Sequence, residues 1–350
     1  MNIFQHQLRA LVVGGGSIGL RHLKNLYQLQ VTDLTVVEPK EFKVSSLGFE
    51  VSVFKTIPDA LSSGNFDFAV IASPSQLHLE QGLLLARENI HLFIEKPLSV
   101  SSSGIAELIE ETAKHELTTI VGCNMRFHPG PLKVKEILET NAIGKVLSAN
   151  FYSGSYLPEW RTTDYRNSYS ASKTQGGGCL LDCIHEIDLA MWLLGGIKNI
   201  YAQLNQLSGL EISAEDAVHL VAQHESEVIS TIALNYFERT YQRNLHLVGD
   251  QGSLFWDING HSVKLYEASS RSWREYPQPQ KWDLNQMYVD EMAHFLSAMR
   301  SHSETCFSVK DAYALMRVIE AIQSSAQLNQ RVDVGKNSLG ETNESNEQAA

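Results

Sequence analysis

Short apolar runs alternate with amphipathic stretches along the first third of the chain. The apolar runs lack the strict alternation that a half-exposed strand shows, so we expect helices to cover both faces of their sheet. This order of strands and helices predicts a doubly wound parallel sheet. The predicted strands span residues 8–13, 34–37, 66–72, 91–94 and 119–122.

The pattern changes after about residue 124, where strands follow one another through turn-like connections. Such a succession predicts a large, mostly antiparallel open sheet in a second, α+β domain. The predicted strands span residues 146–153, 200–206, 217–223, 228–236, 244–248 and 262–266, and two helical segments follow at 284–300 and 309–328. We therefore expect an α/β cofactor domain over 1–123, a substrate and oligomerisation domain over 124–335, and a mobile polar tail over 336–350.

Composition narrows the class of protein. The chain has 350 residues, of which 43% are hydrophobic, enough for a large core and too many for a disordered chain. A net charge of −12 argues against binding to nucleic acid or to an anionic membrane. No apolar run is long enough for a membrane span or a signal peptide, and the four cysteines lack zinc-site spacing. We expect a cytoplasmic protein without a bound metal.

A glycine turn follows the first predicted strand. The segment LVVGGGSIG puts Gly14, Gly16 and Gly19 in the G-x-G-x-x-G arrangement, with Ser17 and Ile18 at the start of the next helix. Glycines let the backbone approach a pyrophosphate at a helix N-terminus, which predicts a Rossmann dinucleotide site.

An acidic residue ends the second predicted strand. Glu38 can accept hydrogen bonds from the adenosine ribose and repel a 2′-phosphate, which favours NAD, with NADP as the alternative. An exposed carboxylate beside Lys40 is the other interpretation of Glu38.

Three further segments carry a resemblance to a known family: ASPSQLH at 72–78, EKPL at 95–98 and GGGCLLDCIHEIDLAMWLLG at 176–195. Together they resemble the Gfo/Idh/MocA oxidoreductases. The resemblance implies a nicotinamide cofactor, a cis peptide bond before Pro97, and a sheet face that pairs with a second copy to give a homodimer or homotetramer. It also implies that the nicotinamide side of the cofactor site contains Ser73, Pro74, His78, Glu95 and Lys96.

The same resemblance implies the catalytic residues. Lys96 would stabilise negative charge on the reacting oxygen. His185 would exchange a proton with the sugar hydroxyl, and Asp182 would be the partner of His185. Many family members have Asp-x-x-x-His where this chain has Asp182-Cys-Ile-His185, and on one helix the shorter spacing would still place both side chains on one face. The alternatives are a surface lysine, a structural histidine and a helix-capping aspartate; a zinc site is disfavoured.

Aromatic and basic residues concentrate ahead of this segment. Aromatic rings stack on sugar C–H surfaces, and guanidinium groups bind carboxylates or phosphates. We therefore expect an anionic or nucleotide-linked sugar, with loop packing or surface ion pairs as the alternative for each side chain. The resemblance extends to a subgroup associated with surface-polysaccharide sugars. The substrate residues proposed on this basis are Arg126, Tyr156, Trp160, Arg161, Tyr165 and Arg166.

The sequence thus predicts an NAD(P)-dependent dehydrogenase that transfers hydride between nicotinamide and a CH–OH carbon of a sugar. Two alternatives remain open: a non-enzymatic regulator that binds dinucleotide and sugar, and an enzyme that uses NAD transiently for elimination or glycoside cleavage.

Overall fold

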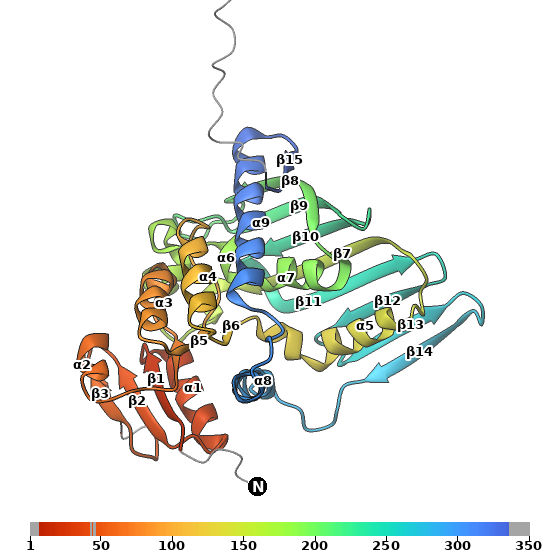
Figure 1. Cartoon of the computed structure of the whole chain (residues 1–350). Coiled ribbons are helices and arrows are strands. Elements are labelled where there is room, and N and C mark those ends of the chain that lie inside the picture. The colour runs from red at the N-terminus through yellow and green to blue at the C-terminus, as the bar shows by residue number, and fades with distance from the viewer. Residues whose placement is uncertain (1–6, 43, 45–46, 336–350) are drawn as a thin grey trace, which may run out of the picture. The chain divides into compact units, whose positions relative to one another are not determined.

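The chain divides into two compact units (Figure 1). The structure is a computed structural model that describes residues 7–42, 44 and 47–335. Unit 1 contains the described residues up to His128 together with Lys281–Ala314, and unit 2 contains Pro129–Gln280 and the described residues from Leu315. We predicted a single boundary near residue 123, which placed 281–314 in the second domain. The structure corrects this prediction, because the segment belongs to unit 1. The predicted mobile tail, 336–350, lies outside the described residues.

Unit 1 is built on a six-stranded sheet in the order β3-β2-β1-β4-β5-β6. Every neighbouring pair is parallel, which confirms the predicted doubly wound sheet. Its strands are β1 (Arg9–Val13), β2 (Asp33–Val37), β3 (Ser52–Phe54), β4 (Phe68–Ile71), β5 (His91–Ile94) and β6 (Thr119–Val121).

Helices cover both faces of this sheet. On one face, α1 (Ser17–Gln28) buries Leu23 and Leu26, and α8 (Gln286–Ser301) buries an apolar stripe around Phe295. The Phe295 ring meets Phe68 and Phe93 edge-on at 5.6 and 5.9 Å between centroids. Because this stripe completes the core beneath β4 and β5, the segment 281–314 belongs to unit 1. The remaining helices are α2 (Ile57–Leu61), α3 (His78–Arg87) and α4 (Ile105–Lys114), of which α3 and α4 pack on the opposite face at Ile94.

Unit 2 contains a nine-stranded sheet in the order β14-β13-β12-β11-β7-β10-β9-β8-β15. Only β7 and β10 pair in parallel, so the predicted mostly antiparallel sheet is confirmed. Its strands are β7 (Val146–Tyr156), β8 (Ile197–Asn205), β9 (Ala217–His224), β10 (Ile229–Asn235), β11 (Phe237–Gly249), β12 (Gly252–Asp257), β13 (Ser262–Glu267), β14 (Ser272–Pro277) and β15 (Val332–Asp333).

The pattern failed to predict four strands. β3, β14 and β15 lie at sheet edges, and β3 and β14 are largely exposed, so little apolar alternation marks them. β12 is different, because Leu254 and Trp256 alternate into the core, but the strand is short and bounded by Gly252 and Asp257.

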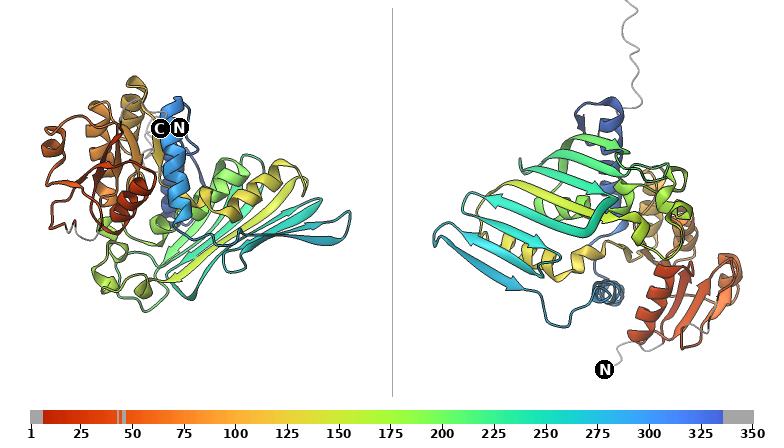
Figure 2. Two further views of the ribbon diagram at one scale, coloured as in Figure 1. Left: turned by 90° about the horizontal axis from the view of Figure 1, so that it is seen from below. Right: turned by 180° about the vertical axis from the view of Figure 1, so that it is seen from behind.

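One face of the large sheet carries α5 (Pro129–Glu139) and α7 (His185–Leu194) (Figure 1), and α9 (Val309–Leu328) reaches β8 through a hydrogen bond from Ala202 N–H to Ser325 Oγ. The strands of the other face have no covering helix among the described residues of unit 2 (Figure 2), and they expose Tyr201, Val221 and Ile229. The expected homo-oligomer stays a prediction. None of the described helices is long and apolar enough to cross a membrane.

The position of α8 leads to a stability prediction. Phe295→Ala should lower the free energy of unfolding of unit 1 by about 3–5 kcal/mol, because it leaves a cavity between α8 and the sheet. Urea titration followed by circular dichroism measures this loss. Ser297→Ala, on the exposed side of the same helix, should change it by less than about 0.5 kcal/mol. Equal effects for the two variants would contradict the placement of α8 in this core.

Candidate active site

The glycine turn joins β1 to α1 in unit 1. Gly14 has φ 104°, and a side chain there would meet the carbonyl of Ala72. A Cβ on Gly19 would overlap the carbonyl oxygen of Gly14, so α1 can approach β1 only with glycine here. Gly16, by contrast, has no atom within 4 Å of a built Cβ, and it caps α1 without a side-chain hydrogen bond. The open backbone at Gly16, Ser17 and Ile18 is therefore a cradle that fits a pyrophosphate.

Glu38 follows β2 and is tied to this turn. Its carboxylate accepts hydrogen bonds from Gly15 N–H at 2.8 Å and from Lys40 N–H at 3.0 Å. The contact with Lys40 involves the backbone rather than its ammonium group. Glu38 thus holds the glycine turn and lies at the end of β2, where the ribose contact was predicted.

The loop after β4 and the turn after β5 are connected by His78. Its ring is buried, with Nε2 2.8 Å from Ser73 O and Nδ1 2.8 Å from Pro97 O. Burial lowers the pKa of His78 from its ordinary value of 6.5, against the opposing effect of these carbonyls. The Lys96–Pro97 bond is cis, as predicted. His78 therefore links Ser73 to Pro97, the residue that follows Lys96, and its own cofactor contact stays a prediction.

Glu95 lies directly before Lys96 and is buried. Its Oε1 is 2.6 Å from Nε2 of His22 on α1. Burial alone would raise the pKa of Glu95, but the hydrogen bond and charge of His22, with Lys96 nearby, lower it below 4.5. Glu95 thus links α1 to the turn that carries Lys96, and its cofactor contact stays a prediction.

Asp182 and His185 do not lie on one helix, which corrects the prediction. α6 (Cys179–Asp182) ends at Asp182, and α7 begins at His185 after the Cys183–Ile184 break. The capping interpretation of Asp182 is also wrong, because the residue before α7 is Ile184. The Asp182 carboxylate instead accepts hydrogen bonds from Tyr236 Oη at 2.6 Å and from Tyr169 Oη at 2.8 Å.

A cavity of about 380 Å³ opens within unit 2 beside Asp182. Two of the predicted substrate residues, Tyr156 and Trp160, line it. Three more of its lining residues, Arg239, Tyr241 and Arg243, come from β11 and were not predicted to be functional. The lining residues are Ser153, Ser155, Tyr156, Glu159, Trp160, Asp182, Cys183, Arg239, Tyr241 and Arg243.

The two cavity arginines have different partners. Arg243 forms an ion pair with the buried Glu186 at 2.7 Å, which links β11 to α7. Arg239 instead lies over the Tyr156 ring at 3.7 Å from its centroid, and no carboxylate of the described residues forms an ion pair with it. Arg239, Tyr241 and Arg243 recur at every second position. That spacing is the signal that could have placed them on one side of a strand.

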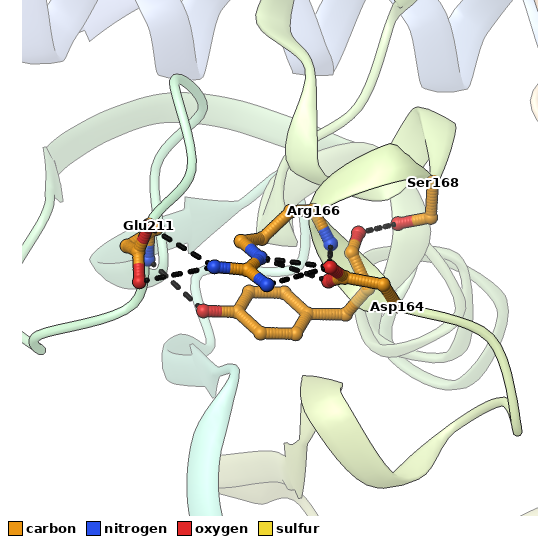
Figure 3. A network of polar contacts seen from close by, with 5 residues as sticks. Asp164, Arg166, Ser168 and Glu211 are labelled. Carbon is orange, nitrogen blue, oxygen red and sulfur yellow. Dashed lines mark hydrogen bonds and ion pairs between the residues drawn. The ribbon is translucent and has the colours of Figure 1, made fainter.

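The other proposed substrate residues lie elsewhere. Arg166 is paired with Asp164 and Glu211 (Figure 3). It lines a second cavity of about 520 Å³, and Tyr165 Oη accepts from Glu211 N–H. Arg161 lies over the Tyr169 ring at 5.3 Å. Arg126 belongs to unit 1, where its buried guanidinium lies over Phe307 and donates to Cys306 O at 2.7 Å.

Metal ligands are not gathered in the described residues: no group of three or more His, Cys, Asp or Glu side chains there could hold an ion. The cradle at the glycine turn, the carboxylate after β2 and the lysine after β5 define a dinucleotide-binding oxidoreductase.

Comparison with known protein families agrees with this assignment. The family description "Oxidoreductase family, NAD-binding Rossmann fold" matches residues 8–123, and "GFO/IDH/MocA C-terminal domain" matches 132–255. The chain belongs to the Gfo/Idh/MocA family, and it is an NAD-dependent oxidoreductase.

Individual relatives are distant. Myo-inositol 2-dehydrogenase of Thermotoga maritima is 25% identical, covering 87% of this chain and 92% of that protein. The scyllo-inositol 2-dehydrogenase (NAD(+)) of Bacillus subtilis is 25% identical, covering 85% and 87%. Among solved structures, levoglucosan dehydrogenase in complex with NADH has a TM-score of 0.84 at 20% identity, covering 95% of this chain and 100% of that one. The similarity to levoglucosan dehydrogenase shows that the two chains share a fold.

The glycine cradle leads to a binding prediction. Gly16→Ala should leave the melting temperature unchanged, because its Cβ meets no protein atom, but should raise the Kd for NADH about tenfold by filling the pyrophosphate cradle. Fluorescence titration measures this change. Gly209→Ala, which also meets no atom but lies in unit 2, should bind NADH like the wild type. Unchanged affinity in Gly16→Ala would place the pyrophosphate elsewhere.

Proposed function

We propose that this protein is an NAD-dependent dehydrogenase that oxidises a hydroxyl group of a sugar carrying a carboxylate or phosphate, or reduces the corresponding ketone. The observation that carries the proposal is Arg239, which lines the same cavity as Asp182. The cofactor site lies in unit 1, and this cavity gives unit 2 a place to recognise the substrate.

Arg239 is suited to recognise an anion. Its guanidinium is held by the Tyr156 ring rather than by a carboxylate, so its N–H donors remain available for a ligand. A guanidinium forms paired, charge-assisted hydrogen bonds with carboxylates and phosphates. Uronates, sugar phosphates and nucleotide-linked sugars share this anionic chemistry.

The sugar ring finds suitable partners in the same cavity. Trp160 and Tyr156 supply aromatic surface, and Ser153 and Ser155 supply hydroxyl groups. The relatives support a polyhydroxylated substrate, since two of them are inositol dehydrogenases. Their substrates are neutral, so the anionic group is the part of the proposal that rests on Arg239.

Each proposed catalytic group has one task. NAD, when bound, supplies the acceptor for the hydride that leaves the substrate carbon. Lys96 lies in the turn whose backbone is held by Glu95 and by the cis bond to Pro97, and its ammonium stabilises negative charge on the reacting oxygen. Asp182 and His185 are the two candidate acceptors of the hydroxyl proton.

The reaction is tested by following NADH formation with a panel of inositols, neutral sugars, uronates, sugar phosphates and nucleotide sugars. We expect turnover with an anionic member. Lys96→Met should lower kcat by about 10²–10³ while NADH binding is kept, because one preorganised electrostatic donor is lost. The absence of turnover with every member of the panel, in either direction, would reject the proposed function.

Selectivity tests the anionic group separately. Arg239→Ala should raise KM for the anionic substrate by about 10- to 100-fold, because a hydrogen-bonded ion pair is lost, with little change for a neutral sugar. Arg239→Lys should recover part of the loss, since it restores the charge without the paired donors. Arg331→Ala, an exposed arginine outside the cavity, is the control. An equal rise in KM for neutral and anionic sugars would remove the anion from the proposal.

A further inference from the structure

The Asp182 carboxylate is held by two tyrosines from different parts of unit 2. Asp182 ends a helix of only four residues, and the Cys183–Ile184 break separates it from α7. The orientation of the carboxylate is set by the hydrogen bonds that it accepts. Tyr236 donates to Oδ2 and Tyr169 donates to Oδ1, so each carboxylate oxygen has its own phenol.

Tyr236 is the more rigid donor. Its side chain is completely buried, its backbone N–H donates to Asp216 O, and its carbonyl accepts from Leu157 N–H. Burial, followed by the charge of Asp182, raises the pKa of Tyr236 well above 10, so the phenol keeps its proton. The 2.6 Å distance is typical of a hydroxyl donating to a charged oxygen.

Tyr169 approaches from the segment between β7 and α6. It lies in the short helix η6 (Tyr169–Ala171), and 37% of its surface is exposed. Its hydroxyl donates to Asp182 Oδ1 at 2.8 Å, so a second phenol holds the other carboxylate oxygen. Asp182 nevertheless lines the cavity, where a substrate can reach it.

We infer that Tyr236 and Tyr169 are positioning residues that hold Asp182 as the proton acceptor of the reaction. The inference rests on the proposed function. In the oxidation, the substrate C–H bond breaks and its electron pair leaves with the hydride to NAD⁺. The O–H bond also breaks, its electron pair forms the C=O bond, and the proton moves to a carboxylate oxygen of Asp182. His185 begins a separate helix and is not among the residues that line this cavity.

Other charged and titratable groups surround Asp182. The Glu215 carboxylate accepts from Leu180 N–H of α6, and the thiols of Cys179 and Cys183 lie close by. Glu159, Arg239 and Arg243 line the same cavity as Asp182. None of these is changed by removing a phenol oxygen. A shift seen on such a removal therefore reports the lost hydrogen bond.

The experiment uses Tyr236→Phe, Tyr169→Phe and the double variant in the full chain. Carbon-13 NMR of the aspartate carboxyls, assigned with Asp182→Asn, follows the Asp182 titration without any substrate. Each single variant should move its midpoint to higher pH by about one unit, because a phenol that donates to a carboxylate stabilises the ionised form. With an active substrate, the acidic limb of kcat/KM should move by the same amount, while KM at high pH stays the same.

Tyr152→Phe is the matched control. Its hydroxyl also donates to a carboxylate, Glu238 at 2.9 Å, but it does not contact Asp182. This variant should leave both the carboxyl titration and the acidic limb in place. Tyr169 is partly exposed, so Tyr169→Phe keeps the test available even if Tyr236→Phe fails to fold.

The outcomes separate the two proposals. A shifted carboxyl titration in a protein that oxidises no sugar would support the positioning of Asp182 and reject the proposed function. Turnover with an unshifted titration and acidic limb in Tyr169→Phe, or a shift no larger than that of Tyr152→Phe, would overturn the inference. A lower melting temperature with no shift in either profile would also overturn it, because the tyrosines would then be structural only.

Discussion

Buried carboxylates lie beside the candidate catalytic groups of both units, and each of them accepts hydrogen bonds or forms an ion pair. In unit 1, Glu95 contacts His22 next to Lys96. In unit 2, Asp182 accepts from Tyr236 and Tyr169, and Glu186 pairs with Arg243 next to His185. A buried charge without a partner would lower the free energy of unfolding by several kcal/mol. The elements that supply the partners, among them α1 in unit 1 and β11 in unit 2, must therefore pack so that these contacts form.

The arginines show how the same side chain serves different purposes. Arg243 and Arg166 form ion pairs with carboxylates of unit 2, and these pairs stabilise the packing of its segments. Arg239 rests on an aromatic ring and keeps its hydrogen-bonding capacity. The partner of each arginine therefore indicates its role better than its position near the Asp182 segment, which was the basis for proposing Arg166.

Much of the fold followed from local patterns. The buried strands of unit 1 and the helix at 309–328 were predictable because burial on both faces or along one stripe leaves a clear apolar pattern. Edge strands β3 and β14 lack that pattern because much of their surface is exposed. The segment 281–314 was misplaced because nothing local shows that Phe295 packs against strands more than two hundred residues earlier.

The sequence by itself determined the features that depend on neighbours along the chain: the glycine turn, the carboxylate that ends β2, and the Lys96–Pro97 turn. Only the tertiary structure decided what contacts Asp182, since the donors Tyr169 and Tyr236 come from separate segments of unit 2, and Arg239 from β11 lines the same cavity as Asp182. The physical reason is that a backbone turn is specified by a few adjacent residues. A hydrogen-bonded cavity is specified by strand register, which depends on the packing of the whole sheet.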